Sequence, residues 1–132
     1  MTVKYTYSFA SPQAAIKGYG GGVVAVTWAS LKDDSVPGEG FQAANWVASS
    51  FQVVGTFGVG GSISLEGSND GQNWAVVPDI NGNPATLTAS GGPGIVFLAE
   101  SPIWLRANVT AGDETTDLTA IVALRRQPNN GG

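Results

Sequence analysis

Hydrophobic and polar residues alternate with a period of two along much of this chain, which is the pattern of half-buried β-strands. The alternation is most regular at 62–66, where Ile63 and Leu65 lie between serines and a glutamate. A turn and a second apolar run at 74–77 follow. The turn and the start of the return strand contain residues suited to a tight hairpin: Asn69, Asp70, Gly71 and Trp74. This stretch therefore predicts a β-hairpin in an all-β domain.

Similar runs, separated by glycine and proline turn signals, predict further strands. They lie at 22–30, 46–57, 85–89, 95–99, 102–109 and 118–124. Residues 41–45 are too few for a core helix and predict only a short helical turn. About eight short strands with almost no helix predict an antiparallel β-sandwich or jelly roll.

Three of these strands carry more detailed expectations. The irregular pattern of 46–57 favours a bulge near Ser49 and Ser50. The run 95–99 is apolar on both faces, as expected for a buried sandwich strand. In 102–109 the alternation places Ile103, Leu105, Ala107 and Val109 inward and Trp104, Arg106 and Asn108 outward.

The first 21 residues are expected to form an N-terminal arm or an edge strand. Tyr5, Tyr7 and Phe9 alternate with polar residues. Tyr19 lies in a glycine-rich stretch that is too flexible to hold structure alone. These aromatic residues either complete their own sheet or dock on a neighbouring subunit. The expected organisation is an arm or edge strand at 1–21, a β-sandwich domain at 22–126 and a disordered tail at 127–132.

The amino-acid composition excludes several kinds of catalytic and metal-binding site. The 132 residues are enough for one domain with a real core. The chain has no cysteine and no histidine, which excludes disulfides, thiolate metal sites and histidine-based catalytic triads. A catalytic site of paired carboxylates remains possible, and its candidates outside the acidic loops are Glu66, Asp70, Asp79 and Glu100. Glu66 lies on an outward strand face and Asp70 and Asp79 lie in turns, so each of these has a local explanation. We therefore expect neither enzymatic activity nor a cofactor.

The low and slightly negative charge of the chain limits the kinds of molecule that it can bind. Only 12% of the residues are charged, the net charge is −4, and there are six basic residues. A nucleic-acid-binding surface needs a basic stripe, which this chain lacks. No apolar run reaches the roughly 20 residues of a membrane helix, and the first residues do not resemble a signal peptide. The small number of charges suggests that much of the surface is covered in an assembly; the alternative is a weakly charged monomer.

The loop 31–40 contains three acidic residues, Asp33, Asp34 and Glu39, whose oxygens could bind calcium. Their spacing does not match an EF-hand loop, so we expect a solvated loop and no metal.

The four tryptophans could form a platform on which sugars stack, or they could be core and interface residues. Trp28 aligns with inward residues and is assigned to the core. Trp74 is expected to pack over the hairpin turn. Trp104 points outward and is the best candidate for contact with a partner, with Trp46 as a second stacking residue in a glycan-binding role.

The stretch 65–74 resembles a hairpin found in many tailed-bacteriophage proteins, in which Gly-Ser-Asn-Asp-Gly and a Trp three residues later join two strands. In those proteins a Pro-x-Tyr/Trp-Ile/Leu-Arg strand follows, and the last strand ends in Leu-Arg-Arg; the counterparts here are 102–106 and 124–126. Discoidin-type domains share the turn, but this chain lacks their paired cysteines and its first third does not match them.

The resemblance implies a small β-sandwich virion component, in particular a head decoration (cement) protein. Such proteins bind the major capsid protein on the outside of the expanded head, often as trimers. It implies a homo-oligomer that is made in the host bacterial cytoplasm and located on the capsid surface. The expected interface residues are Tyr5, Tyr7, Phe9, Tyr19, Trp104 and Arg106. The alternatives are a host-recognition module that binds glycans on the virion surface, and a tail or baseplate component.

Overall fold

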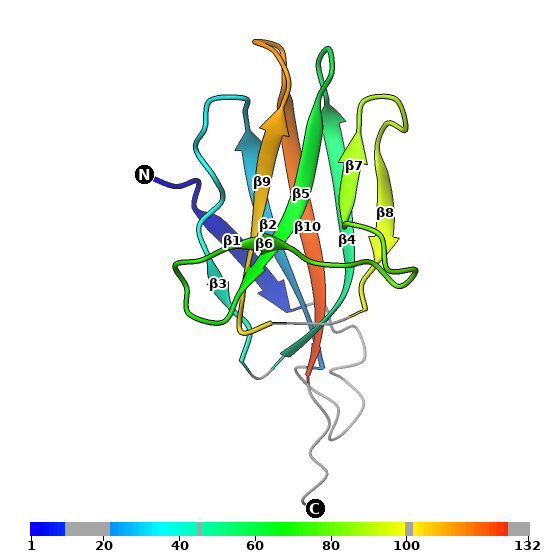
Figure 1. The fold of residues 1–132 in the computed structure, drawn as a ribbon. Helices are drawn as coiled ribbons and strands as arrows, with labels where there is room; N and C mark the ends of the chain where they lie inside the picture. Colours follow the sequence, from blue (N-terminus) through cyan, green and yellow to red (C-terminus); the bar gives the residue numbers. More distant parts are fainter. Residues whose placement is uncertain (10–21, 45, 100–101, 127–132) are drawn as a thin grey trace, which may run out of the picture.

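The computed structural model describes residues 1–9, 22–44, 46–99 and 102–126, with Phe9 described by its backbone. Two antiparallel sheets pack face to face, and no helix occurs in the described residues (Figure 1). The predicted all-β sandwich is therefore confirmed, with ten strands instead of about eight.

The first sheet has five strands in the order β1-β2-β10-β4-β8. Their bounds are β1 Tyr5–Phe9, β2 Val23–Leu31, β10 Asp117–Arg126, β4 Trp46–Thr56 and β8 Gly94–Phe97. The second sheet has the order β3-β9-β5-β6, and β7 also pairs with β5. Their bounds are β3 Phe41–Gln42, β9 Trp104–Ala111, β5 Ser62–Ser68, β6 Ala75–Val76 and β7 Thr86–Thr88.

The core lies between the sheets because every second residue of the long strands points inward. In β2, β10 and β4 the fully buried apolar side chains are Val24, Val26, Trp28, Leu31, Leu118, Ala120, Val122, Leu124, Phe51 and Val53. From the second sheet they meet Ile63, Leu65, Leu105, Ala107 and Val109. The period-two pattern in the sequence is thus the direct signature of this core.

The N-terminal strand connects the two sheets. Val3 donates its N–H to the carbonyl of Pro37 (2.8 Å) and accepts from the N–H of Glu39 (2.7 Å). β1 then pairs along β2 in the first sheet. Tyr5 packs edge-on against Trp28 and Phe41. Residues 5–9 are therefore an edge strand of their own domain, and 10–21 lie outside the described residues, as does the tail at 127–132.

The bulge predicted near Ser49 and Ser50 is confirmed. Along β10, Ala123 pairs with Ser50 but Leu124 pairs with Ala48, so Ser49 is the extra residue in β4. The hydroxyl of Ser49 donates a hydrogen bond to the carbonyl of Ala123 (3.1 Å). The bulge lets Ala48 and Phe51 both face the core although they are three residues apart.

The prediction that 95–99 is buried was wrong. β8 is an edge strand that pairs with β4, and the side chains of Ile95 and Phe97 point outward, with 49% and 58% of each residue exposed. A short apolar run has no periodicity to distinguish a central strand from an edge strand, which explains the error.

Two smaller expectations also fail. The helical turn expected at 41–45 is instead the short strand β3, which pairs with β9, followed by a turn closed by the hydrogen bond from Trp46 N–H to the Ala43 carbonyl. Ile103 is exposed and does not face inward, because β9 begins one residue later and the backbone of Ile103 bonds to Asn69 and Ala43.

Candidate functional site

The predicted hairpin forms between β5 and β6, and its loop is wider than a tight turn. Glu66 pairs with Val76 and Gly67 with Ala75, which leaves seven residues, 68–74, between the last paired positions. Gly71 has a φ of +75°, the conformation that glycine adopts at no steric cost.

Asp70 organises the loop as a hydrogen-bond acceptor. Its Oδ1 accepts from the hydroxyl of Ser68 and from the backbone N–H groups of Gln72 and Asn73, each at 2.8 Å. Its Oδ2 accepts from the side-chain amide of Asn73 at 2.7 Å. These bonds, above all those from Asn73, hold the pKa of the Asp70 carboxyl well below its ordinary value.

Acid is expected to loosen this loop. Because the pKa of Asp70 is lowered by folding, its stabilising contribution is present above about pH 4 and is lost as the pH falls through the folded pKa. We expect the amide protection factors of Gln72 and Asn73 to fall between pH 6 and pH 2, measured by hydrogen exchange. The amides of Gly91 and Gly92 are the control, because they donate to the backbone carbonyl of Thr88. An equal fall at both places would contradict the prediction.

The outward face of β5 and β9 carries a polar cluster. The Nε of Arg106 donates to Oε1 of Glu66 at 2.7 Å, and the amide of Asn108 donates to Oε2 at 3.2 Å. The guanidinium of Arg106 lies 4.4 Å from the centre of the Trp74 ring. The side chains of Glu66 and Arg106 are only 12% and 20% exposed. Arg106 is therefore held by an ion pair and a cation–π contact within the chain.

Trp104 lies beside the loop. A Cβ placed on Gly71 would lie 3.4 Å from the Trp104 ring, and one on Gly40 would lie 3.0 Å from Trp74 and 3.5 Å from Trp104. Both tryptophans are half-buried. The ring that packs on the hairpin turn is thus that of Trp104, whereas Trp74 packs on Arg106. Neither ring is an open platform.

The remaining expected interface residues lie apart from this cluster. Tyr5 is half-buried against Trp28 and Phe41, while Tyr7 is exposed at the edge formed by β1. The backbone of Phe9 pairs with Val24. The Phe9 side chain and the whole of Tyr19 lie outside the described residues.

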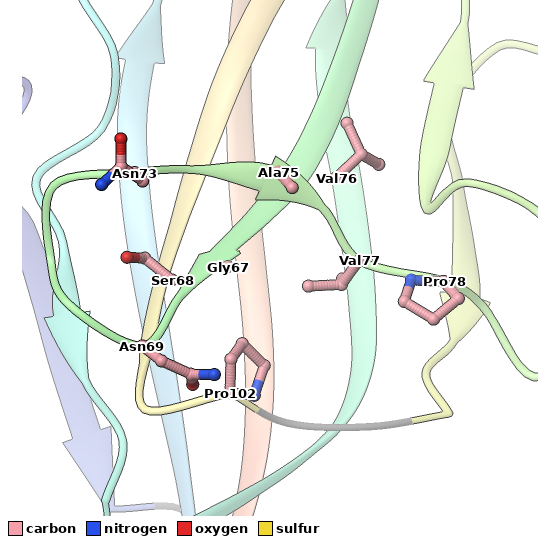
Figure 2. Close-up of a pocket in the computed structure, with 9 residues that line it drawn as sticks. All are labelled: Gly67, Ser68, Asn69, Asn73, Ala75, Val76, Val77, Pro78 and Pro102. Atoms are coloured by element: carbon pink, nitrogen blue, oxygen red, sulfur yellow. The ribbon is translucent and has the colours of Figure 1, made fainter.

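A cavity of about 470 Å³ lies next to the hairpin loop (Figure 2). Its lining contains no ionisable side chain and consists of Gly67, Ser68, Asn69, Asn73, Ala75, Val76, Val77, Pro78 and Pro102. Gly67 is required there, since a Cβ would collide with Pro102 and lie 2.8 Å from Val77. The lining offers hydrogen-bonding groups, among them the hydroxyl of Ser68, which donates to Asp70.

Several acidic residues of the loops at 31–40 and 112–116 have local partners. Asp34 accepts from the N–H of Val36 (3.1 Å), and Glu39 lies 3.6 Å from the ammonium of Lys4. Asp113 accepts from Thr115 and from the N–H of Val59, which lowers its pKa, the Thr115 hydroxyl being the first cause. Within the described ranges, no group of three or more acidic side chains is placed to hold a metal ion. The same residues contain no helix long and apolar enough to cross a membrane.

Sequence patterns missed the exposed pair Ile95 and Phe97, which were expected in the core. Their run is short and directly follows Pro93, a residue typical of the start of an edge strand, and this was the available signal.

No family model, no curated protein and no solved structure matches this chain.

Proposed function

We propose that this protein is a non-enzymatic structural component of a tailed-bacteriophage virion. In this role it is a decoration protein that binds the major capsid protein on the outside of the head and stabilises the shell. It does so as a homo-oligomer and contacts neither nucleic acid nor membrane. It is made in the cytoplasm of the host bacterium and is located on the capsid surface.

The observation that carries the proposal is the outer face of the sheet β1-β2-β10-β4-β8. The strand alternation assigns to this face a set of uncharged residues that includes Ala25, Thr27, Ser50, Gln52, Val54, Ile95, Phe97, Thr119, Ile121 and Ala123. On β10, charges occur only at the two ends, at Asp117 and at Arg125 and Arg126. An uncharged surface of this kind loses little hydration energy when it is covered. Repeated by symmetry over a shell, modest contacts add up to a large stabilisation.

The contacts of the hairpin also support the proposal. The segments that resemble phage virion proteins are far apart in sequence, yet they meet in the fold. Trp74 stacks on Arg106, Trp104 lies against Gly71, and the N–H of Ile103 donates to the side chain of Asn69 (3.3 Å). The motifs 65–74 and 102–106 therefore act as one structural unit.

The glycan-binding alternative has less support. Trp28 is in the core, and Trp46, Trp74 and Trp104 are half-buried, so no tryptophan of the chain presents a freely exposed ring. A tail or baseplate component would be present in far fewer copies per virion than a head decoration protein. The copy number therefore distinguishes these two roles.

The deciding experiment is a count of this protein against the major capsid protein in purified virions by quantitative mass spectrometry. A ratio near one supports the decoration role. A few copies per particle would instead indicate the tail or baseplate, and complete absence from virions would refute the proposal.

Two matched variants then test the docking face. Val54→Asp places a charge on the outer face of β4, and Val59→Asp places the same charge in the loop after it, where the valine is exposed. We expect Val54→Asp to lower binding to empty capsid shells about tenfold or more, equivalent to at least about 1.4 kcal/mol. Val59→Asp should bind as the unmodified protein does. Equal binding of both variants would rule out this face, provided that both melt like the unmodified protein.

A further inference from the structure

The segment between β6 and β7, residues 77–85, leaves the second sheet and returns to it at the same residue of β5. Val77 donates its N–H to the carbonyl of Leu65, and Leu65 donates its own N–H to the carbonyl of Ala85, each at 3.0 Å. Ala85 also donates its N–H to the carbonyl of Val77 at 2.8 Å. These bonds fix both ends of residues 78–84, which we call the strap.

The strap lies along the outward edge of β8, the last strand of the first sheet, and Figure 1 shows the chain reaching from β6 to the lower end of β8. Asp79 and Leu98 are partners in an antiparallel bridge. The backbone hydrogen bonds on either side of this bridge run from the Ile80 N–H to the Phe97 carbonyl (2.8 Å) and from the Ala99 N–H to the Pro78 carbonyl (3.4 Å). The strap therefore occupies the backbone groups that another strand would use to pair with β8 at 97–99.

Asp79 holds the strap in this conformation. Its Oδ1 accepts the backbone N–H groups of Asn81 (2.8 Å) and Asn83 (2.9 Å). Its own N–H donates to the carbonyl of Asn83 at 2.6 Å, and its carbonyl accepts from the N–H of Gly82 at 3.0 Å. These bonds close residues 79–83 into a turn that keeps the backbone of Ile80 against β8.

The edge of β8 has no other protection against strand pairing in the part of the chain that the structure describes. Edge strands are normally protected by a charge, a bulge or a covering segment. Residues 93–98 contain no charged side chain, and the register of β8 on β4 is unbroken from Gly94 to Phe97, so no bulge interrupts it. Ile95 and Phe97 are 49% and 58% exposed. The strap is therefore the covering segment on which this edge depends.

We propose that the strap is a built-in block on self-association: it occupies the edge of β8 in the place of a strand from a second copy of this chain. When the strap detaches, β8 becomes an edge through which two copies pair. The geometry of such pairing is already present within the chain, because residues 78–80 lie antiparallel to 97–99. Since the strap is attached to β5 at both ends, its concentration beside β8 is far higher than that of a second copy in solution. The strap in place thus prevents association through this edge.

Hydrogen exchange of Asp79→Ala tests whether Asp79 holds the strap on β8. The substitution removes the carboxylate that accepts the two N–H groups of the turn. We expect the amides of Ile80 and Ala99, which bond across the bridge, to exchange about tenfold faster or more than in the unmodified protein. Unchanged exchange at both amides would contradict this part of the proposal.

Two variants are matched controls, because each removes the same single negative charge. Asp79→Asn keeps an acceptor oxygen in place and should retain the exchange rates of the unmodified protein. Asp34→Ala removes an aspartate that likewise accepts an N–H two residues further on, from Val36 at 3.1 Å, but in the loop 31–40. It should leave Ile80 and Ala99 unaffected.

Sedimentation of the purified full chain tests the block on self-association. Asp79→Ala should raise the association constant between copies about tenfold or more above that of the unmodified protein. Ile80→Pro removes the N–H that bonds to Phe97 and should have the same effect. Asp79→Asn and Asp34→Ala should associate as the unmodified protein does. Far-UV circular dichroism confirms that each variant is folded.

A second substitution identifies the surface through which the copies associate. Ile95→Lys places a charge on β8 and should reverse the association of both Asp79→Ala and Ile80→Pro, because a charged edge strand resists pairing. The proposal is overturned if neither strap variant associates more strongly, or if Ile95→Lys fails to reverse the association. These measurements use the isolated protein, so their failure would leave the copy-number test of the virion role unaffected.

Discussion

Trp28→Ala is expected to lower the free energy of unfolding by about 3–5 kcal/mol, the range for removing a large buried aromatic side chain. The Trp28 side chain is fully buried and packs edge-on against Tyr5. A Cβ on Gly38 would lie 2.7 Å from its ring, so the surrounding backbone is fitted closely to the indole. Urea unfolding followed by circular dichroism measures the loss.

Trp28→Phe is the matched control. It keeps most of the volume but removes the indole N–H, which donates to the carbonyl of Glu39 at 2.8 Å. We expect this variant to lose about 1–3 kcal/mol, less than the alanine variant. If alanine costs no more than phenylalanine, then the packing of Trp28 does not hold the two sheets together as described.

Glu66→Ala is expected to destabilise the protein by about 2–3 kcal/mol, because it leaves Arg106 largely buried without its counter-ion. Full burial would give a larger loss, but both side chains retain some exposure. In a double-mutant cycle with Arg106→Ala, we expect a coupling energy of about 1–2 kcal/mol. Thermal and urea unfolding of the four proteins supply the values.

The pair of Lys32 and Asp117 provides the control cycle. Its charged atoms are 3.3 Å apart, but the two side chains are 52% and 53% exposed. A solvated pair of this kind is expected to couple by no more than about 0.5 kcal/mol. Similar coupling in both cycles would mean that the Glu66–Arg106 pair is not protected from solvent by Trp74.

The local signals of the sequence identified most of the fold. The alternation in β2 and β5 predicted that Trp28, Ile63 and Leu65 are buried, because a residue on a paired strand has only two faces to choose between. It did not predict that Ser64, on the polar face of β5, is buried as well. The bulge at Ser49 was visible as a break in that alternation. The hairpin was visible because Asp70 and Gly71 are residues that loops require.

The candidate site could be predicted only in part from the sequence. The outward positions of Trp104, Arg106 and Glu66 follow from the alternation of apolar and polar residues along their strands. Their meeting does not, because Glu66 and Arg106 are 40 residues apart and become neighbours only through the β5–β9 register. Nor could the sequence show that the loop folds back so that Trp74, and not a partner, covers Arg106.

By itself, the sequence determined the all-β class, the inward side chains of the long strands, the hairpin and the lack of histidine and cysteine chemistry. These properties depend on residue type and on spacing over a few positions. Only the tertiary structure decided the order of the strands, and therefore that β8 lies at an edge with Ile95 and Phe97 exposed. An apolar run is equally compatible with a central strand and with an edge, and the difference comes from which distant strands pair beside it.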